Sequence, residues 1–247
     1  MSVTNLGDSM EEERSFDTLG LKPGDRVLDV GCGDGSDALE LARRVGWDGT
    51  VVGIDTNEAV IEAARDGAAG EALPVQFQVG DAYALAFDDQ DFNAVRADRV
   101  FLEIERPDEA LAELARVLKH GGTLYLRDPD IQTLLIDAPD APVEVTRTIA
   151  EAWSDGFANG WIGRQLPRRL RDEGMESIVY APRTLVLRTL DEAEAMFGIG
   201  PALRAATVSG ALSDADGDAW LAALRYADEQ NRFTFSLTFF ECFGSKS

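Results

Sequence analysis

The sequence predicts an α/β fold with a doubly wound, mostly parallel sheet, and three observations support this prediction. Short apolar runs alternate with helical patterns in the first half of the 247-residue chain, as expected for βα units. The glycine-rich turn at 30–35, VGCGDG, follows the first apolar run and opens a helical pattern, which is where doubly wound sheets bind nucleotides. The late stretch 232–244 alternates apolar and polar residues and therefore predicts a strand with two different faces.

The elements of the first half follow from periodicity and from start and stop signals. Five strands are predicted at 26–31, 50–55, 75–81, 92–98 and 123–128. Apolar residues at three- and four-residue spacing predict helices at 36–45, 57–67 and 108–122. The third helix starts after Pro107, and we expect it to end at Gly121-Gly122.

After Asp128 the βα pattern is lost, and the second half is expected to carry helical insertions. The segment at about 130–160 is predicted to be a helical lid, and a second insertion is predicted at about 191–230. Between them lie a predicted helix at 164–173 and a strand at 177–187. We expect one domain over residues 1–247, with the insertions belonging to it.

The composition limits the partners of this chain. Its formal net charge is -22, and it has only three lysines. Such a polyanion repels nucleic acid and anionic membranes, so neither is expected as a partner; a salt-adapted cytoplasm is the competing explanation of the acidity. No apolar run approaches the ~18 residues of a membrane span, and the N-terminal stretch is polar, which predicts a soluble cytoplasmic protein. Two cysteines without zinc-like spacing predict no metal site.

The ligand of the glycine turn can be argued from charge. A dinucleotide would place its pyrophosphate at this turn, but Asp29, Asp34 and Asp37 lie in or beside it. S-adenosylmethionine carries an ammonium and a sulfonium instead, and carboxylates favour both. The acidic turn therefore favours S-adenosylmethionine over a nicotinamide cofactor.

Two more acidic residues fall at the ends of predicted strands. Asp55 ends the second strand, where a carboxylate can accept hydrogen bonds from ribose hydroxyls. Asp81 ends the third strand, where its carboxylate or the backbone of Ala82 can meet the amino edge of adenine. Both positions predict a nucleoside site.

With these residues the chain resembles the class I S-adenosylmethionine-dependent methyltransferases, in particular the small-molecule group of the ubiquinone/menaquinone-biosynthesis type. The matching motifs are VLDVGCGDG, VVGID, VGDA and ADRVFLEIERPDEALAELARVLKHGGTLYL. The resemblance implies a Rossmann-like seven-stranded sheet with an antiparallel late strand and helices on both faces. It also implies these cofactor-binding residues: Asp29, Gly31, Cys32, Gly33, Asp55, Thr56, Asp81, Ala82, Asp98 and Arg99.

Two departures from the family pattern concern catalysis. Glu103 stands where the family often has histidine, so no catalytic residue is assigned. The only histidine, His120, lies in the sequence KHGG, and we expect it to cap a helix end rather than to take part in catalysis.

Substrate-binding residues are predicted from the region after the fifth strand. The candidates are Asp128, Asp130, Trp153, Phe157 and Trp161. For the two aspartates the favoured interpretation is that they end the strand in an Asp-Pro turn, whereas the aromatic residues can equally be core.

The resulting prediction is an enzyme that transfers a methyl group from S-adenosylmethionine to an oxygen, carbon or nitrogen of a small acceptor. We expect the acceptor to be a hydrophobic or aromatic compound and S-adenosylhomocysteine to be the second product. The alternatives are a nicotinamide-dependent oxidoreductase and a non-catalytic S-adenosylmethionine-binding protein. The sequence leaves the acceptor open, and it does not distinguish a monomer from a homodimer.

Overall fold

The computed structural model describes residues 16–247 of the chain. The polar N-terminal stretch, from which we predicted a cytoplasmic protein, lies outside these residues. The chain divides into two compact units. The first takes its described residues from Met1–Asp128, Gln165–Ala181 and Glu241–Ser247, and the second consists of Pro129–Arg164 and Pro182–Phe240.

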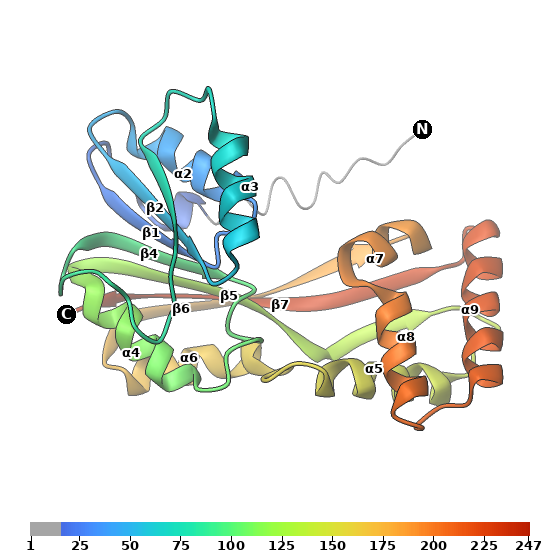
Figure 1. Ribbon diagram of the computed structural model, residues 1–247. Coiled ribbons are helices and arrows are strands. Elements are labelled where there is room, and N and C mark those ends of the chain that lie inside the picture. Colours follow the sequence, from blue (N-terminus) through green and yellow to red (C-terminus); the bar gives the residue numbers. More distant parts are fainter. Residues whose placement is uncertain (1–15) are drawn as a thin grey trace. The chain divides into compact units, whose positions relative to one another are not determined.

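A seven-stranded sheet has the order β3-β2-β1-β4-β5-β7-β6 (Figure 1). Its strands are β1 Arg26–Val30, β2 Thr50–Asp55, β3 Val75–Val79, β4 Phe92–Asp98, β5 Leu118–Asp137, β6 Met175–Leu187 and β7 Thr234–Lys246. The first five pair in parallel, and the sheet contains an antiparallel pairing among the late strands. The structure therefore confirms the predicted mixed, mostly parallel sheet.

The helices of the first unit cover both faces of the sheet, because the chain adds strands first on one side of β1 and then on the other. They are α2 Ser36–Val45, α3 Glu58–Ala68, α4 Pro107–Val117 and α6 Leu166–Asp172. From β1 the chain proceeds outward through β2 and β3, and from β4 it proceeds the other way to β5. Since parallel crossovers are right-handed, α2 and α3 cover one face and α4 the other, where it packs against α6 (Figure 1).

Helix α4 is shorter than the sequence predicted. It begins at Pro107 and has Asp108 and Glu109 in its first turn, where carboxylates favour the helix dipole. It ends at Val117, and Leu118 already pairs with Phe92 of β4. The prediction that this helix runs to Gly122 is therefore wrong, because residues 118–122 form an irregular start of β5.

Strand β5 is longer than predicted and runs through Pro129 to Asp137. The predicted end of the strand at the Asp-Pro turn is wrong, and so is the prediction that a helical segment begins at about 130. Helix α5, Val143–Asp155, starts only after this strand. The helical prediction failed here because the strand continues past a proline that sequence patterns treat as a stop.

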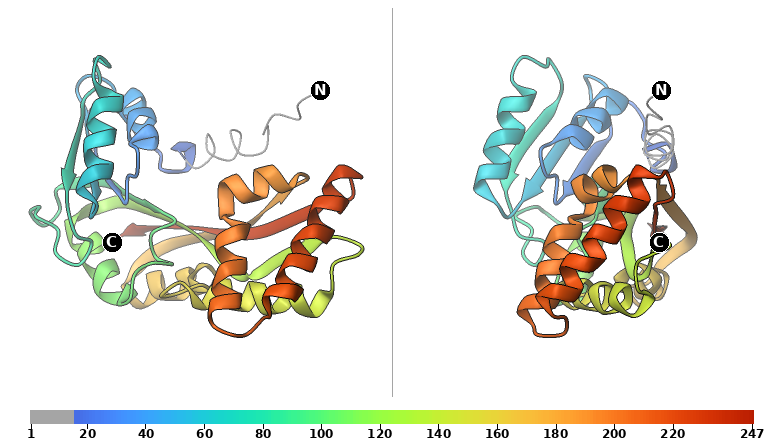
Figure 2. Two further views of the ribbon diagram at one scale, coloured as in Figure 1. Left: turned by 45° about the vertical axis from the view of Figure 1, so that its right-hand side comes forward. Right: turned by 90° about the vertical axis from the view of Figure 1, so that its right-hand side faces the viewer.

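The second unit has a hydrophobic core of its own. Its helices are α5, α7 Leu190–Phe197, α8 Ile199–Val208 and α9 Asp214–Glu229, with a 3-10 turn η1 at Ile162–Gln165 leading out of it. Helix α8, orange, packs against α5, yellow-green, and against α9, red (Figure 2). Trp220, Phe235 and Leu224 are buried at the centre of this core. The two segments predicted as insertions, 130–160 and 191–230, both lie entirely within this unit.

No helix in residues 16–247 is long and apolar enough to cross a membrane. Within the same residues, no group of three or more potential metal ligands comes together.

Candidate functional site

The glycine turn after β1 adopts a backbone that side chains disfavour. Gly31, Gly33 and Gly35 have φ values of +67°, +53° and +83°, in the left-handed region. A Cβ at Gly31 would lie 2.5 Å from Cγ2 of Val100, and one at Gly35 would lie 2.6 Å from Cζ of Phe77. A Cβ at Gly33 would meet no atom within 4 Å, so open space lies beside this backbone.

Two cavities border this turn within the first unit. The first has a volume of about 430 Å³ and is lined by Gly31, Asp55, Thr56, Asp81, Ala82, Tyr83, Arg99 and Glu103, among others. The second has a volume of about 590 Å³ and is lined by Gly31, Cys32, Gly33, Asp34, Asp37, Arg96, Asp98 and Arg99, among others. They share Gly31 and Arg99, and they lie where β1 and β4 meet, beyond the carboxyl ends of both strands. In open α/β sheets this switch point is where ligands bind.

The acidic residues at the ends of β2 and β3 line the first cavity, and each organises its own loop. Asp55 accepts hydrogen bonds from the amides of Asn57 at 2.9 Å and Gly33 at 3.4 Å. Asp81 is exposed and accepts one from the amide of Tyr83 at 2.9 Å. Because each carboxylate can accept further bonds, both can also accept from a ligand in the cavity.

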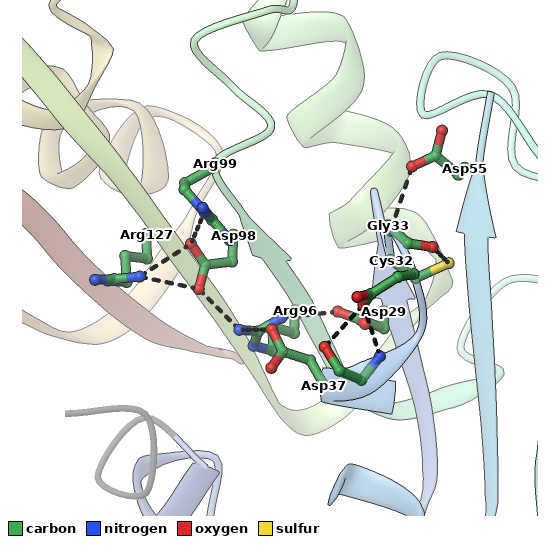
Figure 3. Close-up of polar contacts among 11 residues, drawn as sticks. Asp29, Cys32, Gly33, Asp37, Asp55, Arg96, Asp98, Arg99 and Arg127 are labelled. Carbon is green, nitrogen blue, oxygen red and sulfur yellow. Dashed lines mark hydrogen bonds and ion pairs between the residues drawn. The ribbon is translucent and has the colours of Figure 1, made fainter. Parts of the chain in front are cut away.

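Arg96 forms the centre of a buried ionic cluster beside the second cavity (Figure 3). It comes from β4, and its guanidinium donates to Asp29 at 3.1 Å, to Asp37 at 2.7 Å and to Asp98 at 2.8 Å. The side chains of Arg96 and Asp29 are 3% and 1% exposed. Asp98 also pairs with Arg127 at 3.4 Å and with Arg99 at 3.7 Å.

The charges of this cluster follow from its geometry. Burial by itself would raise the pKa of Asp98, but Arg127, Arg96 and Arg99 outweigh this effect and hold the pKa below its usual value. At Asp29 burial outweighs the attraction of Arg96 and raises the pKa to about 6. Asp98 is therefore an anion that is already paired with guanidinium groups, and it is a poor candidate for a general base.

Asp29 lies behind the cavity wall rather than in it. Its side chain is buried against Arg96, and its Oδ2 has no hydrogen-bond partner among the described residues. Asp34, Asp37 and Asp98 line the second cavity, whereas Asp29 does not belong to its lining. The predicted contact of Asp29 with a cofactor stays a prediction, and Asp34, Asp37 and Asp98 are the carboxylates that line the cavity.

Sequence reasoning missed Arg96 as a site residue, although a signal was present. Arg96 interrupts the apolar strand FNAVRAD, in which Val95 and Ala97 are buried. A charge within a buried strand requires partners, and the acidic residues around the glycine turn are the available ones. Asp37 was noted as an acidic neighbour of that turn but was not assigned to the site.

Cys32 contributes its small apolar side chain rather than its reactivity. It is 7% exposed, and burial raises the pKa of its thiol to about 12, with Asp29 and Asp55 adding to the shift. The thiol therefore stays protonated, and its proximity to the cavity reflects packing.

The two aspartates of the predicted substrate site are committed to backbone and arginine partners. Asp128 is fully buried and accepts hydrogen bonds from the amides of Phe101 at 3.2 Å and Leu102 at 3.0 Å. Its pKa is raised well above the usual value by burial. Asp130, in the second unit, pairs with Arg164 and accepts from the amide of Gln132 at 3.1 Å. Both side chains hold local structure.

The three aromatic candidates belong to the second unit and differ in exposure. Trp153 is half-buried and packs against Phe157 and Phe197, with ring centroids 6.1 Å apart in each pair. Trp161 is 48% exposed. The core interpretation therefore holds for Trp153 and Phe157, and Trp161 is the one that presents its ring to solvent.

Comparisons with family models, curated proteins and solved structures all point to methyltransferases. Residues 21–174 match the family model described as "Methyltransferase domain". The chain is 37% identical over 208 residues to an uncharacterized 37.1 kDa protein in transposon TN4556 of Streptomyces fradiae, which covers 83% of this chain and 59% of that protein. It is 39% identical over 109 residues to a 2-phytyl-1,4-naphtoquinone methyltransferase of Synechococcus elongatus, covering 43% of this chain and 47% of the relative.

The chain thus spans less than two thirds of the length of either relative. Among solved structures, the YcgJ protein of Bacillus subtilis is similar with a TM-score of 0.66 and 20% identity, covering 96% of this chain and 98% of that one. At this identity the likeness shows the fold, and it agrees with the Rossmann-like topology derived above.

Proposed function

The chain belongs to the methyltransferase domain family of S-adenosylmethionine-dependent enzymes, and from this premise we propose that it transfers the methyl group of S-adenosylmethionine to a small-molecule acceptor. One observation carries the proposal: the cavity beside the glycine turn is lined by three carboxylates, those of Asp34, Asp37 and Asp98, against two guanidinium groups, those of Arg96 and Arg99, so its lining is acidic on balance. Such a wall favours a ligand with an ammonium and a sulfonium and disfavours a pyrophosphate.

The residues present fit this cofactor. The open space beside Gly33 allows a ligand to approach the backbone closely. Asp55 would accept hydrogen bonds from the ribose hydroxyls, and Asp81 and Ala82, which line the same cavity, would contact the adenine. In the second cavity Asp34 and Asp37 would attract the cationic groups, with Asp98 and its arginine partners bordering them. Arg99, which is largely exposed, would hold the carboxylate of the methionine portion.

When bound, the cofactor supplies an electrophilic methyl group, and the chain supplies alignment. Methyl transfer is an in-line displacement, so catalysis depends mainly on orienting the acceptor and excluding water. Asp98 and Asp128 are both occupied by other partners. Glu103 is exposed, but it lines the first cavity, which we assign to the ribose and the adenine. We therefore assign no catalytic base, and an acceptor with an easily lost proton fits such a site best.

For the acceptor we propose a hydrophobic or aromatic compound. Trp161, whose ring is 48% exposed, is the aromatic candidate that remains free to contact such a molecule. A second support is that the relative from Synechococcus elongatus is named for a naphthoquinone substrate.

Calorimetry and a turnover assay test the proposal together. We expect micromolar binding of S-adenosylmethionine and S-adenosylhomocysteine and no measurable binding of NADH. Methyl transfer is then measured by mass spectrometry on a panel of phenols, quinones and amines. Tighter binding of NADH would contradict the cofactor assignment. Binding without turnover of any compound in the panel would favour the alternative of a non-catalytic binding protein.

The acceptor proposal is tested separately with two tryptophan variants. Trp161→Ala should lower methyl transfer severalfold while leaving the affinity for S-adenosylhomocysteine unchanged. Trp47→Ala, which removes an equally large ring that is 75% exposed in the first unit, is the matched control and should keep full activity. If Trp161→Ala also keeps full activity, the acceptor does not contact this ring.

A further inference from the structure

The three lysines and the single histidine of the sequence lie at one end of the first unit. The chain contains three lysines and one histidine, against 45 acidic residues. Lys22, Lys119 and His120 line one cavity of about 160 Å³, together with Asp25, Asn93 and Thr123. The third lysine, Lys246, donates to the carbonyl oxygens of Ala115 at 2.7 Å and Leu118 at 2.9 Å. Lys246 therefore adds a positive charge beside Leu118, the residue before Lys119.

This cavity lies at the opposite end of the strands from the site described above. Asn93 is near the amino end of β4, and Lys119 and His120 are at the amino end of β5. The cofactor cavities lie beyond the carboxyl ends of the same sheet. Since strands rise about 3.3 Å per residue, the seven residues of β4 separate the two ends by roughly 20 Å.

Several hydrogen-bond donors of the cavity are not used by the protein. The ammonium of Lys22 has no hydrogen bond or ion pair to any residue within 16–247. Lys119 donates to Oδ1 of Asn93 at 2.9 Å, which leaves two of its three N–H groups. The same oxygen accepts from the amide of Arg26 at 3.0 Å, so the amide nitrogen of Asn93 is the group left to donate.

The charges facing the cavity give it a net positive sign. Asp25 is its one carboxylate among the lining residues, and its Oδ2 accepts a hydrogen bond from the backbone amide of Lys22 at 2.7 Å. The ring of His120 uses Nδ1 to contact a backbone oxygen of Ser247, which at the end of this chain belongs to a carboxylate, and this leaves Nε2 available. With Lys246 and this carboxylate counted, three ammonium groups lie against two carboxylates. This balance is unusual for a chain with a formal charge of -22.

We propose that this cavity binds a compact oxyanion of phosphate size, either free phosphate or the phosphate of a phosphorylated metabolite. Lysine ammonium groups bind phosphate as point charges, and the amide of Asn93 supplies a neutral donor. The volume of about 160 Å³ accommodates one such group but not a nucleotide. The site is independent of the proposed methyl transfer, because it shares no lining residue with the cofactor cavities.

The experiment uses the full chain and inorganic phosphate as the probe, with chloride at the same ionic strength as the reference. Calorimetry and the thermal unfolding midpoint should both report binding. Lys22→Gln and Lys119→Gln should each weaken it about tenfold, the loss expected for one hydrogen bond to a charged group, and the double variant should abolish it. Glycerol 3-phosphate is measured in parallel, since tighter binding of the ester identifies a phosphorylated metabolite as the source of the anion.

Arg147→Gln is the matched control, because it removes one exposed positive charge from α5 in the second unit. It should bind phosphate as the unaltered chain does. Circular dichroism in chloride establishes that each variant is folded, and all variants should keep their affinity for S-adenosylhomocysteine. Absence of phosphate binding, or equal binding by the double variant and the Arg147→Gln control, would overturn the proposal.

Discussion

Arg96 is held in a strand of buried residues by three carboxylates that come from different parts of the chain. Moving an ion into a protein interior costs several kcal/mol, and attraction to well-placed counter-ions offsets that cost. The partners are Asp29 of β1, Asp37 of α2 and Asp98 at the end of β4. Through this cluster, β1, α2 and β4 are tied together beside the second cavity, so Arg96 acts as a positioning residue for the acidic wall.

The raised pKa of Asp29 leads to a pH-dependent stability. The folded state binds its proton with a pKa of about 6, against an ordinary value of 3.8. The folded state therefore binds more protons than the unfolded state between these values, and this contribution is lost as the pH rises through 6. On lowering the pH from 7 to 5, the free energy of unfolding should rise by roughly 1 kcal/mol more in the unaltered chain than in Asp29→Asn.

Urea unfolding of both proteins at pH 5, 6 and 7 measures this difference. Asp48→Asn, a change at an exposed position before β2, should follow the unaltered chain. Parallel pH profiles for the unaltered chain and Asp29→Asn would show that Asp29 does not titrate in this range.

Asp55 is the residue whose cofactor role can be tested most directly. Asp55→Ala should weaken binding of S-adenosylhomocysteine by roughly 1.5–3 kcal/mol, the range for a hydrogen bond to a charged group. The variant also loses the carboxylate acceptor of Asn57, so circular dichroism must show that the fold is kept. Calorimetry gives the affinities, and Asp48→Ala serves as the control. An unchanged dissociation constant for Asp55→Ala would remove this residue from the site.

At the scale of the elements, the turn between β1 and α2 depends on three glycines for two different reasons. All three have positive φ values, so any side chain causes backbone strain. Gly35 also lies against the ring of Phe77 and the methyl group of Ala64, whereas a side chain at Gly33 would enter open space. Gly35 therefore supports the packing of α2 and α3, and Gly33 leaves room for a ligand.

Alanine substitutions should separate these two roles. Gly35→Ala should destabilise the fold by about 1–3 kcal/mol more than Gly33→Ala, because overpacking adds to the same backbone strain. Gly33→Ala should instead show the larger loss of S-adenosylhomocysteine affinity per unit of lost stability. Urea unfolding and calorimetry on both variants provide the comparison, and equal stability losses would contradict the packing argument.

At the scale of the whole molecule, the formal charge of -22 implies self-repulsion in the folded state. Potassium chloride screens this repulsion, since the Debye length falls from about 30 Å at 0.01 M to 3 Å at 1 M. The thermal unfolding midpoint should therefore rise by a few degrees over this range. Sucrose at matched osmolality is the control for preferential exclusion, and a midpoint that stays flat in salt would count against adaptation to a high-salt cytoplasm.

The parts of the fold that the sequence predicted well are those with a strong local period. Strands β1, β2 and β4 and helix α2 were placed within a residue of their bounds, because buried parallel strands are short apolar runs and amphipathic helices show a 3.6-residue period. The end of α4 and the course of β5 were misplaced. There the pairing of Leu118 with Phe92 and the continuation through Pro129 depend on neighbouring strands rather than on local pattern.

The sequence by itself determined the order of strands and helices, the glycine turn and the acidic residues that end β2 and β3, since each of these is written in a few consecutive residues. Only the tertiary structure decided that Arg96 unites acids up to 67 residues away, that Trp153 packs into a core while Trp161 does not, and that Lys22 and Lys119 share a cavity. The physical reason is that the burial of a side chain and the pairing of its charge depend on the residues around it in space. Residues distant along the chain supply those surroundings, and only folding brings them together.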